Sequence, residues 1–206
     1  MAFSNLPSRT RKIIVIGAVL WSAALISLGL TYYSESKNTG SQGGKIASTS
    51  GIGGAFELTS HTGEKITDKA LLGAPFLVFF GFTHCPDICP TALFDMSEAL
   101  RATGTEGAKL RALYISVDPE RDTVDVLKNY MSSFDPRVMA LTGDAQSVQN
   151  TARAYRAYYK KVPTKESYTM DHSSAVYLMD KNGQFLRTID LKRDPQIVAK
   201  ELIGLL

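Results

Sequence analysis

The chain has 206 residues, of which 44% are apolar and 21% charged, a composition typical of a globular protein with one ordinary domain and an appendage. Its net charge of +3 at pH 7 is supplied by Arg9, Arg11 and Lys12, which all precede the first acid, Glu35. The rest of the chain is neutral and has no cluster of Lys and Arg, which argues against a nucleic-acid-binding surface.

Residues 1–12 form a short basic N-terminus, and residues 13–33, IIVIGAVLWSAALISLGLTYY, carry no charge. At about 1.5 Å per residue this run is long enough to cross a bilayer core of about 30 Å, so we predict one transmembrane anchor. No small-residue cleavage site follows it, which disfavours the competing interpretation as a signal peptide. The positive-inside rule places the N-terminus in the cytoplasm and the rest in the periplasm of a bacterial inner membrane. A mitochondrial inner membrane is the less favoured alternative, because the leader is short for a transit peptide.

Residues 34–54 are rich in Ser, Gly and Thr and predict a flexible linker. The folded domain is expected at 55–206. At its start, residues 55–60 and 65–68 flank the polar turn HTGE and predict a hairpin. The run PFLVFFGFT at 75–83 is continuously apolar, as is typical of a strand buried on both faces.

Helical and strand patterns then alternate. A helix is expected at 91–103, and the strands at 109–118 and 138–143 enclose a second helix at 123–134, with Val126 among its inward-facing residues. A third helix is expected at 144–159, where Asp144 is placed to cap it.

The last part of the domain predicts a hairpin and a helix. The apolar runs at 174–180 and 184–190 are joined by KNG, a tight-turn signal. Asp194 and Pro195 open the final helix as a cap followed by a first-turn proline.

Together these elements predict an α/β, thioredoxin-like fold with an N-terminal hairpin and an inserted loop. Ligands of such sheets gather at the carboxyl ends of the strands. The segment GFTHCPDICPT at 81–91, which holds both cysteines of the chain, begins at such a strand end.

Cys85 and Cys89 have three explanations. A structural disulfide between them would close a very short loop and stabilise the domain by roughly 2 kcal/mol, which a domain of this size does not need. A redox couple is favoured by the helix that follows, because a helix N-terminus stabilises thiolates and is expected to keep the two sulfurs ionised. The carboxylate of Asp87 opposes that effect. A metal site is the third explanation.

A metal site needs a third ligand besides the two thiolates. Of the three histidines, His61 is expected to be solvated in a hairpin turn, and His84 to point away from its neighbour Cys85. His172 precedes a strand of the same sheet, and the long polar segment before it could fold over the cysteine loop. Two thiolates and one imidazole suit copper, as Cu(I) with three ligands or Cu(II) with one more. Zinc with an open position remains an alternative.

Three segments resemble the Sco/SenC family of membrane-tethered copper chaperones: GFTHCPDICPT at 81–91, YISVDPERDT at 114–123 and DHSSAVYLMD at 171–180. The resemblance covers residues 55–206 and extends to the anchor and linker. It implies a thioredoxin-like fold that binds one Cu(I) or Cu(II) per chain. The implied ligands are Cys85, Cys89 and His172, with Asp87 and Asp171 as residues that support the ligands or face a partner.

The same resemblance implies a role in building the dinuclear copper centre of cytochrome c oxidase subunit II. The implied partners are that subunit, or a related copper protein, and a periplasmic copper donor. We therefore expect a copper-delivery protein rather than a turnover enzyme. The alternative is a membrane-bound thiol-disulfide oxidoreductase that reduces cysteines of a partner through Cys85 and Cys89. A peroxidase is the least favoured hypothesis. A disulfide between Cys85 and Cys89 cannot hold copper through those sulfurs.

Overall fold

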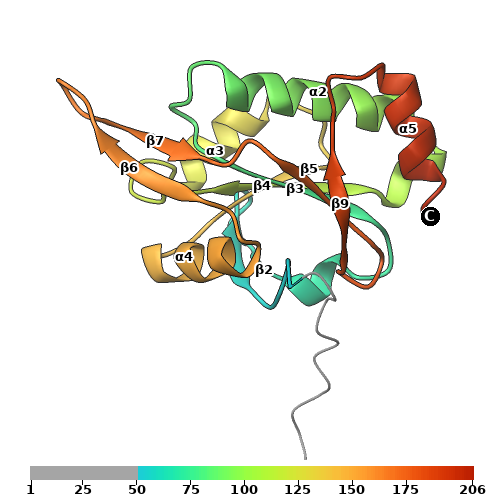
Figure 1. The fold of residues 1–206 in the computed structure, drawn as a ribbon, viewed down its shortest axis with the longest axis horizontal. Coiled ribbons are helices and arrows are strands. Elements are labelled where there is room, and N and C mark those ends of the chain that lie inside the picture. Colours follow the sequence, from blue (N-terminus) through green and yellow to red (C-terminus); the bar gives the residue numbers. More distant parts are fainter. Residues whose placement is uncertain (1–50) are drawn as a thin grey trace, which may run out of the picture. The chain divides into compact units, whose positions relative to one another are not determined.

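The computed structural model describes residues 51–206, which are built around a seven-stranded mixed sheet (Figure 1). The strand order is β2-β1-β5-β4-β3-β8-β9. The strands β3, β4 and β5 at its centre run parallel, and the flanking strands are antiparallel to their neighbours. The strand bounds are β1 Glu57–Ser60, β2 Lys65–Thr67, β3 Phe76–Gly81, β4 Arg111–Ser116, β5 Val138–Thr142, β8 Val176–Met179 and β9 Phe185–Ile189.

Helices cover the two faces of this sheet. The helices α2 and α5 lie side by side on one face, and α4 lies on the opposite face (Figure 1). Every residue of β3 is buried, as expected for a central strand between two helical layers. The helix bounds are α2 Ile88–Ala102, α3 Val124–Met131, α4 Ala145–Ala154 and α5 Pro195–Ile203, with short 3₁₀ helices at Asp68–Leu71 and Glu106–Lys109.

The predicted helices and strands all occur in the predicted order, including the N-terminal hairpin and the late hairpin of β8 and β9, but two further strands lie between α4 and β8. Two predicted helix caps are also confirmed. Asp144 accepts a hydrogen bond from the backbone N–H of Ser147, and Asp194 accepts one from that of Gln196. Both carboxylates thereby satisfy N–H groups that have no partner inside the helix.

Three helix boundaries and one burial prediction are wrong. Helix α3 ends at Met131 rather than at residue 134. Helix α2 begins at Ile88, before the expected start at residue 91, because proline is tolerated anywhere in a first turn and does not have to open it. Helix α4 ends at Ala154, short of residue 159, because Arg156 adopts the left-handed conformation, with φ of 52°, without a glycine to announce the stop. Val126 is 37% exposed rather than inward-facing.

The polar segment before His172 forms two strands that sequence patterns did not predict. Strands β6 (Tyr159–Pro163) and β7 (Tyr168–His172) pair only with each other and form a separate two-stranded sheet. This β6–β7 hairpin projects from the body of the domain as an arm (Figure 1). His172 is its last residue and pairs with Tyr159 at the base.

The predicted basic N-terminus (1–12), the transmembrane anchor (13–33) and most of the linker (34–54) lie outside the described residues. Within 51–206, no helix combines the length and the apolar character needed to cross a membrane. At the start of the described chain, the N–H of Gly53 donates to the carbonyl of Ala154 at 2.9 Å, so this part of the predicted linker contacts the domain.

Candidate metal centre

The two cysteines occupy the turn that joins β3 to α2. Cys85 is partly exposed in the loop, whereas Cys89 lies in the first turn of α2 and is fully buried. Both are free thiols. The backbone N–H of Cys89 points at Cys85 Sγ at 3.4 Å, so a free N–H of the helix start is directed at the other sulfur.

His172 reaches the same place from the arm. Its Nδ1 lies 3.0 Å from the carbonyl oxygen of Ser173, which can only accept, so Nδ1 carries the proton. Nε2 therefore presents its lone pair, at 3.5 Å from Cys89 Sγ. Two rings hold the imidazole edge-on, since the centroids of Phe79 and Phe82 lie 6.1 and 5.7 Å from that of His172.

The three predicted ligand side chains are thus brought together. One sulfur each from Cys85 and Cys89 and one ring nitrogen from His172 lie within 4.8 Å of one another. Atoms bound to one central ion at about 2.0–2.3 Å lie at most about 4.6 Å apart. The group is therefore close to the dimensions of a three-ligand site, and its thiolate and imidazole donors suit copper.

The electrostatics of Cys89 differ from the expectation. Burial raises the pKa of its thiol well above the usual range, and the neighbouring Cys85 adds to the rise. The prediction that the helix start keeps the sulfurs ionised is therefore wrong for Cys89, because desolvation outweighs it. The protonated thiol donates to the free Nε2 of His172, and a metal ion must displace that proton to bind.

Two residues that pack against the Cys89 sulfur, Gly81 and Tyr114, were not predicted from the sequence to belong to the site. Gly81, the last residue of β3, has so little space that a Cβ there would lie 2.8 Å from Cys89 Sγ and 2.7 Å from Cε2 of Tyr114. The Tyr114 hydroxyl is buried beside Cys89, and burial, with the neighbouring Cys89 thiol adding to the effect, raises its pKa well above the usual range. A glycine at the strand end just before the cysteine loop was the available signal for this close packing.

Neither aspartate expected near the ligands bonds to one. Asp87 is the exposed N-cap residue of α2 and makes no capping hydrogen bond, and it lines a surface pocket with Ile88. Asp171 is exposed on β7, opposite Lys160 of β6. The group that supports a ligand in the described part of the chain is instead the backbone carbonyl of Ser173.

The other two histidines lie outside the group. His84 is exposed, and its Nδ1 contacts the hydroxyl of Thr83 at 3.2 Å. His61 is partly buried, and its Nδ1 accepts from the N–H of Ala140 at 3.2 Å, so the expectation of a solvated turn histidine is wrong. It extends the hydrogen bonding of β1 along the edge of β5.

The comparisons with known proteins agree with this geometry. Residues 44–206 match the model of the SCO1/SenC family. The human "Protein SCO1 homolog, mitochondrial" is 45% identical over 139 residues, which cover 66% of this chain and 46% of the relative. The "SCO2-like protein" of Rickettsia felis is 33% identical over 203 residues, 97% of this chain and 99% of the relative. The chain spans about half the length of the human relative and nearly all of the rickettsial one.

Among solved structures, Bradyrhizobium japonicum ScoI with copper bound is 52% identical, with a TM-score of 0.74 over 75% of this chain and 99% of that one. This likeness confirms the predicted α/β, thioredoxin-like fold for the domain. The match of the family model and the rickettsial relative confirm the resemblance read from the three motifs. The chain therefore belongs to the SCO1/SenC family.

Proposed function

We propose that the chain is a membrane-tethered copper-delivery protein that carries one copper ion between Cys85, Cys89 and His172. The observation that supports this proposal most directly is the convergence of two sulfurs and one imidazole nitrogen within 4.8 Å. The copper-bound state of the Bradyrhizobium relative supports the choice of metal. Copper is cargo in this scheme, so the chain is not an enzyme.

The donor set suits both oxidation states of copper. Two thiolates and a neutral imidazole give a site of charge −1 with Cu(I) and of zero charge with Cu(II), so burial opposes neither strongly. Because Cys89 is buried and Cys85 is partly exposed, an incoming thiol reaches the Cys85 side first. Stepwise exchange of ligands from that side is a direct way to pass the ion on.

The proposed acceptor is the dinuclear copper site of cytochrome c oxidase subunit II or a related copper protein, and the donor is a periplasmic copper protein. The proposed location is the bacterial inner membrane. The anchor at 13–33 holds the chain there, with the N-terminus in the cytoplasm and the domain in the periplasm. The linker at 34–54 lets the domain reach a membrane-bound acceptor.

A titration of the reduced full-length protein with Cu(I) against a competing chelator tests the proposal. We expect one copper per chain in the wild type and a weakened or lost site in Cys85→Ala, Cys89→Ala and His172→Ala. His84→Ala is the matched control, because His84 is exposed and outside the ligand group. Unchanged binding in His172→Ala would overturn the three-ligand site.

A second candidate function, reduction of a partner's disulfide, is favoured by one observation. Both cysteines are free, and their two sulfurs lie within 4.8 Å of each other, a separation that a short loop can close to form a disulfide. In that reaction, the two thiols become a disulfide and pass two electrons and two protons to the partner disulfide, which becomes two thiols. His172→Ala would leave thiol exchange with an oxidised peptide intact, whereas either cysteine substitution would abolish it.

A further inference from the structure

The β6–β7 arm carries His172 but does not belong to the main sheet, so other contacts must hold it in place. Neither of its strands pairs with the seven-stranded sheet. Successive side chains of a strand alternate, so Tyr168, Met170 and His172 share one face of β7. Met170 is buried in the core, and His172 packs against Phe82. The remaining residue of that face, Tyr168, must then be held by something outside the sheet.

That partner is Arg121, in the loop between β4 and α3. Its guanidinium carbon lies 3.7 Å above the centre of the Tyr168 ring, and its Nη1 donates to the Tyr168 carbonyl at 3.0 Å. The same guanidinium lies 5.9 Å from the ring of Phe82, which contacts His172. Arg121 therefore lies between the arm and a ring that touches the imidazole.

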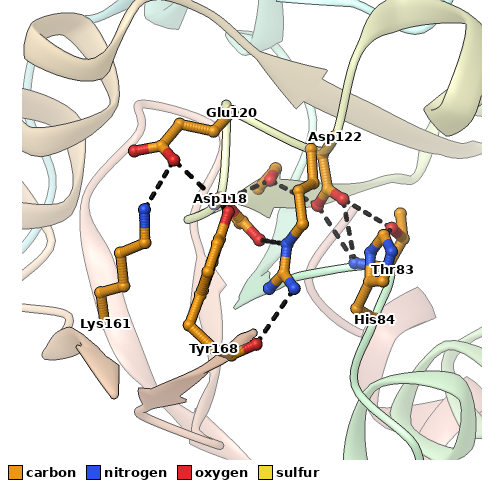
Figure 2. Close-up of polar contacts among 9 residues, drawn as sticks. Thr83, His84, Asp118, Glu120, Asp122, Lys161 and Tyr168 are labelled. Carbon is orange, nitrogen blue, oxygen red and sulfur yellow. Dashed lines mark hydrogen bonds and ion pairs between the residues drawn. The ribbon is translucent and has the colours of Figure 1, made fainter. Parts of the chain in front are cut away.

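A carboxylate of the same loop orients both partners. Asp118 is buried, and its two oxygens accept from Arg121 Nε at 2.5 Å and from the Tyr168 hydroxyl at 2.9 Å (Figure 2). A planar guanidinium that is bonded at its edges and stacked on a ring is held in one orientation, which a lysine cannot reproduce.

The same loop also holds the cysteine segment. The carboxylate of Asp122 is fully buried and accepts from the N–H of Thr83 at 3.1 Å and from its hydroxyl at 2.5 Å (Figure 2). Its other donor is the hydroxyl of Ser116, at the end of β4, at 2.6 Å. Thr83 is two residues before Cys85, so one short loop, residues 118–122, contacts both ligand-bearing segments.

The burial of Arg121 Nη2 argues against a purely stabilising role, and the ion pair between the arm and the loop is too exposed to fix the arm. This nitrogen is buried without a hydrogen-bond partner, which costs stability. Lys161 and Glu120 join the arm to the loop at 2.6 Å, but both are exposed, and such a surface ion pair contributes little. The buried contact of Arg121 is thus the specific one.

We propose that Arg121 is a positioning residue for the metal centre: through Tyr168 it fixes the arm so that Nε2 of His172 faces the two sulfurs. This inference rests on the proposed function only for its use of copper as a probe. The placement of the imidazole in the metal-free protein is a separate property and can be measured by itself.

The test compares Arg121→Gln with Arg101→Gln in the full-length protein. Arg101 is a matched control, because it is an exposed arginine that pairs with Glu98 three residues earlier. The first measurement, on the reduced metal-free protein, records the ring signals of His172 by NMR, which depend on its distance from the Phe82 ring. We expect these signals to move in Arg121→Gln and to stay in place in the control.

The second measurement is the Cu(I) affinity, with and without His172. Substitutions beside a metal ligand typically reduce affinity by about 10–100-fold, and we expect a loss in that range for Arg121→Gln. In a His172→Ala background the same substitution is expected to change affinity less than about twofold, because the arm then carries no ligand. In the Cu(II) spectrum of Arg121→Gln, the signal from the coordinated imidazole nitrogen is expected to weaken in parallel.

Several outcomes would overturn the inference: unmoved His172 signals and wild-type affinity, or an affinity loss of the same size with and without His172. If Arg121→Gln does not fold, Tyr168→Leu removes the other half of the contact and must give the same pattern. A wild type that binds no copper would defeat the proposed function, and the metal-free NMR comparison would still decide the role of Arg121.

Discussion

Gly81 offers a sharp test of how closely the metal loop is packed. An alanine there would place its Cβ 2.8 Å from Cys89 Sγ and 2.7 Å from Tyr114 Cε2, whereas ordinary contacts of such a carbon begin at 3.4 Å. Both neighbours are fully buried, so neither can move into solvent. Overpacking of this kind costs about 1–3 kcal/mol. Gly81→Ala should therefore lower the melting temperature of the metal-free protein by about 2–4 °C for each kcal/mol.

The assay is thermal unfolding of the reduced protein, followed by Cu(I) titration. Gly204→Ala is the control, because a Cβ there would meet nothing closer than 3.4 Å and its φ is −63°. The destabilisation by Gly81→Ala should shrink in a Cys89→Ala background, where the sulfur is gone, and copper binding should weaken because the sulfur is displaced. A melting temperature equal to that of Gly204→Ala would refute this reasoning.

Two further predictions concern stability outside the site. The guanidinium of Arg137 donates two hydrogen bonds to the Asp135 carboxylate, its backbone N–H donates a third, and together they hold the pKa of that carboxyl below its usual range. A lowered folded-state pKa contributes stability that is present above about pH 4 and is lost as the pH falls through it. Asp135→Asn should therefore cost about 2 kcal/mol in urea unfolding at pH 7 and much less at pH 3; an equal cost at both values would contradict this. Asp194→Ala should cost about 1 kcal/mol by removing the cap on Gln196 of α5, whereas Asp194→Asn, which keeps the acceptor, should unfold like the wild type.

The order of the fold could be read from the sequence because strong local signals mark most of its elements. The run at 75–83 is a continuous apolar stretch that predicts a buried strand, and Asp194 followed by Pro195 predicts the start of a helix. The metal ligands could also be named, since Cys85 and Cys89 follow a strand end and motifs of the family include His172. Their convergence within 4.8 Å agrees with that expectation.

What escaped prediction depends on tertiary contacts. Strand β7 contains Asp171 on its exposed face and buries Met170 on the other, which looks like a polar loop until its partner strand is known. The raised pKa of the Cys89 thiol follows from its complete burial, which depends on the packing of Tyr114 and Gly81 from other elements. The local sequence predicts the helix-dipole effect, which lowers the pKa of the thiol. It does not predict the desolvation, which raises that pKa by more.

The isolation of the arm also bears on how such a site can arise and vary. Because β6 and β7 pair only with each other, the hairpin can be lengthened, shortened or exchanged without shifting the register of any strand in the main sheet. The body of the domain supplies two sulfurs, and a hairpin outside the main sheet supplies the nitrogen. A change confined to residues 159–172 could thus add or remove the nitrogen ligand while the strand order of the main sheet stays the same.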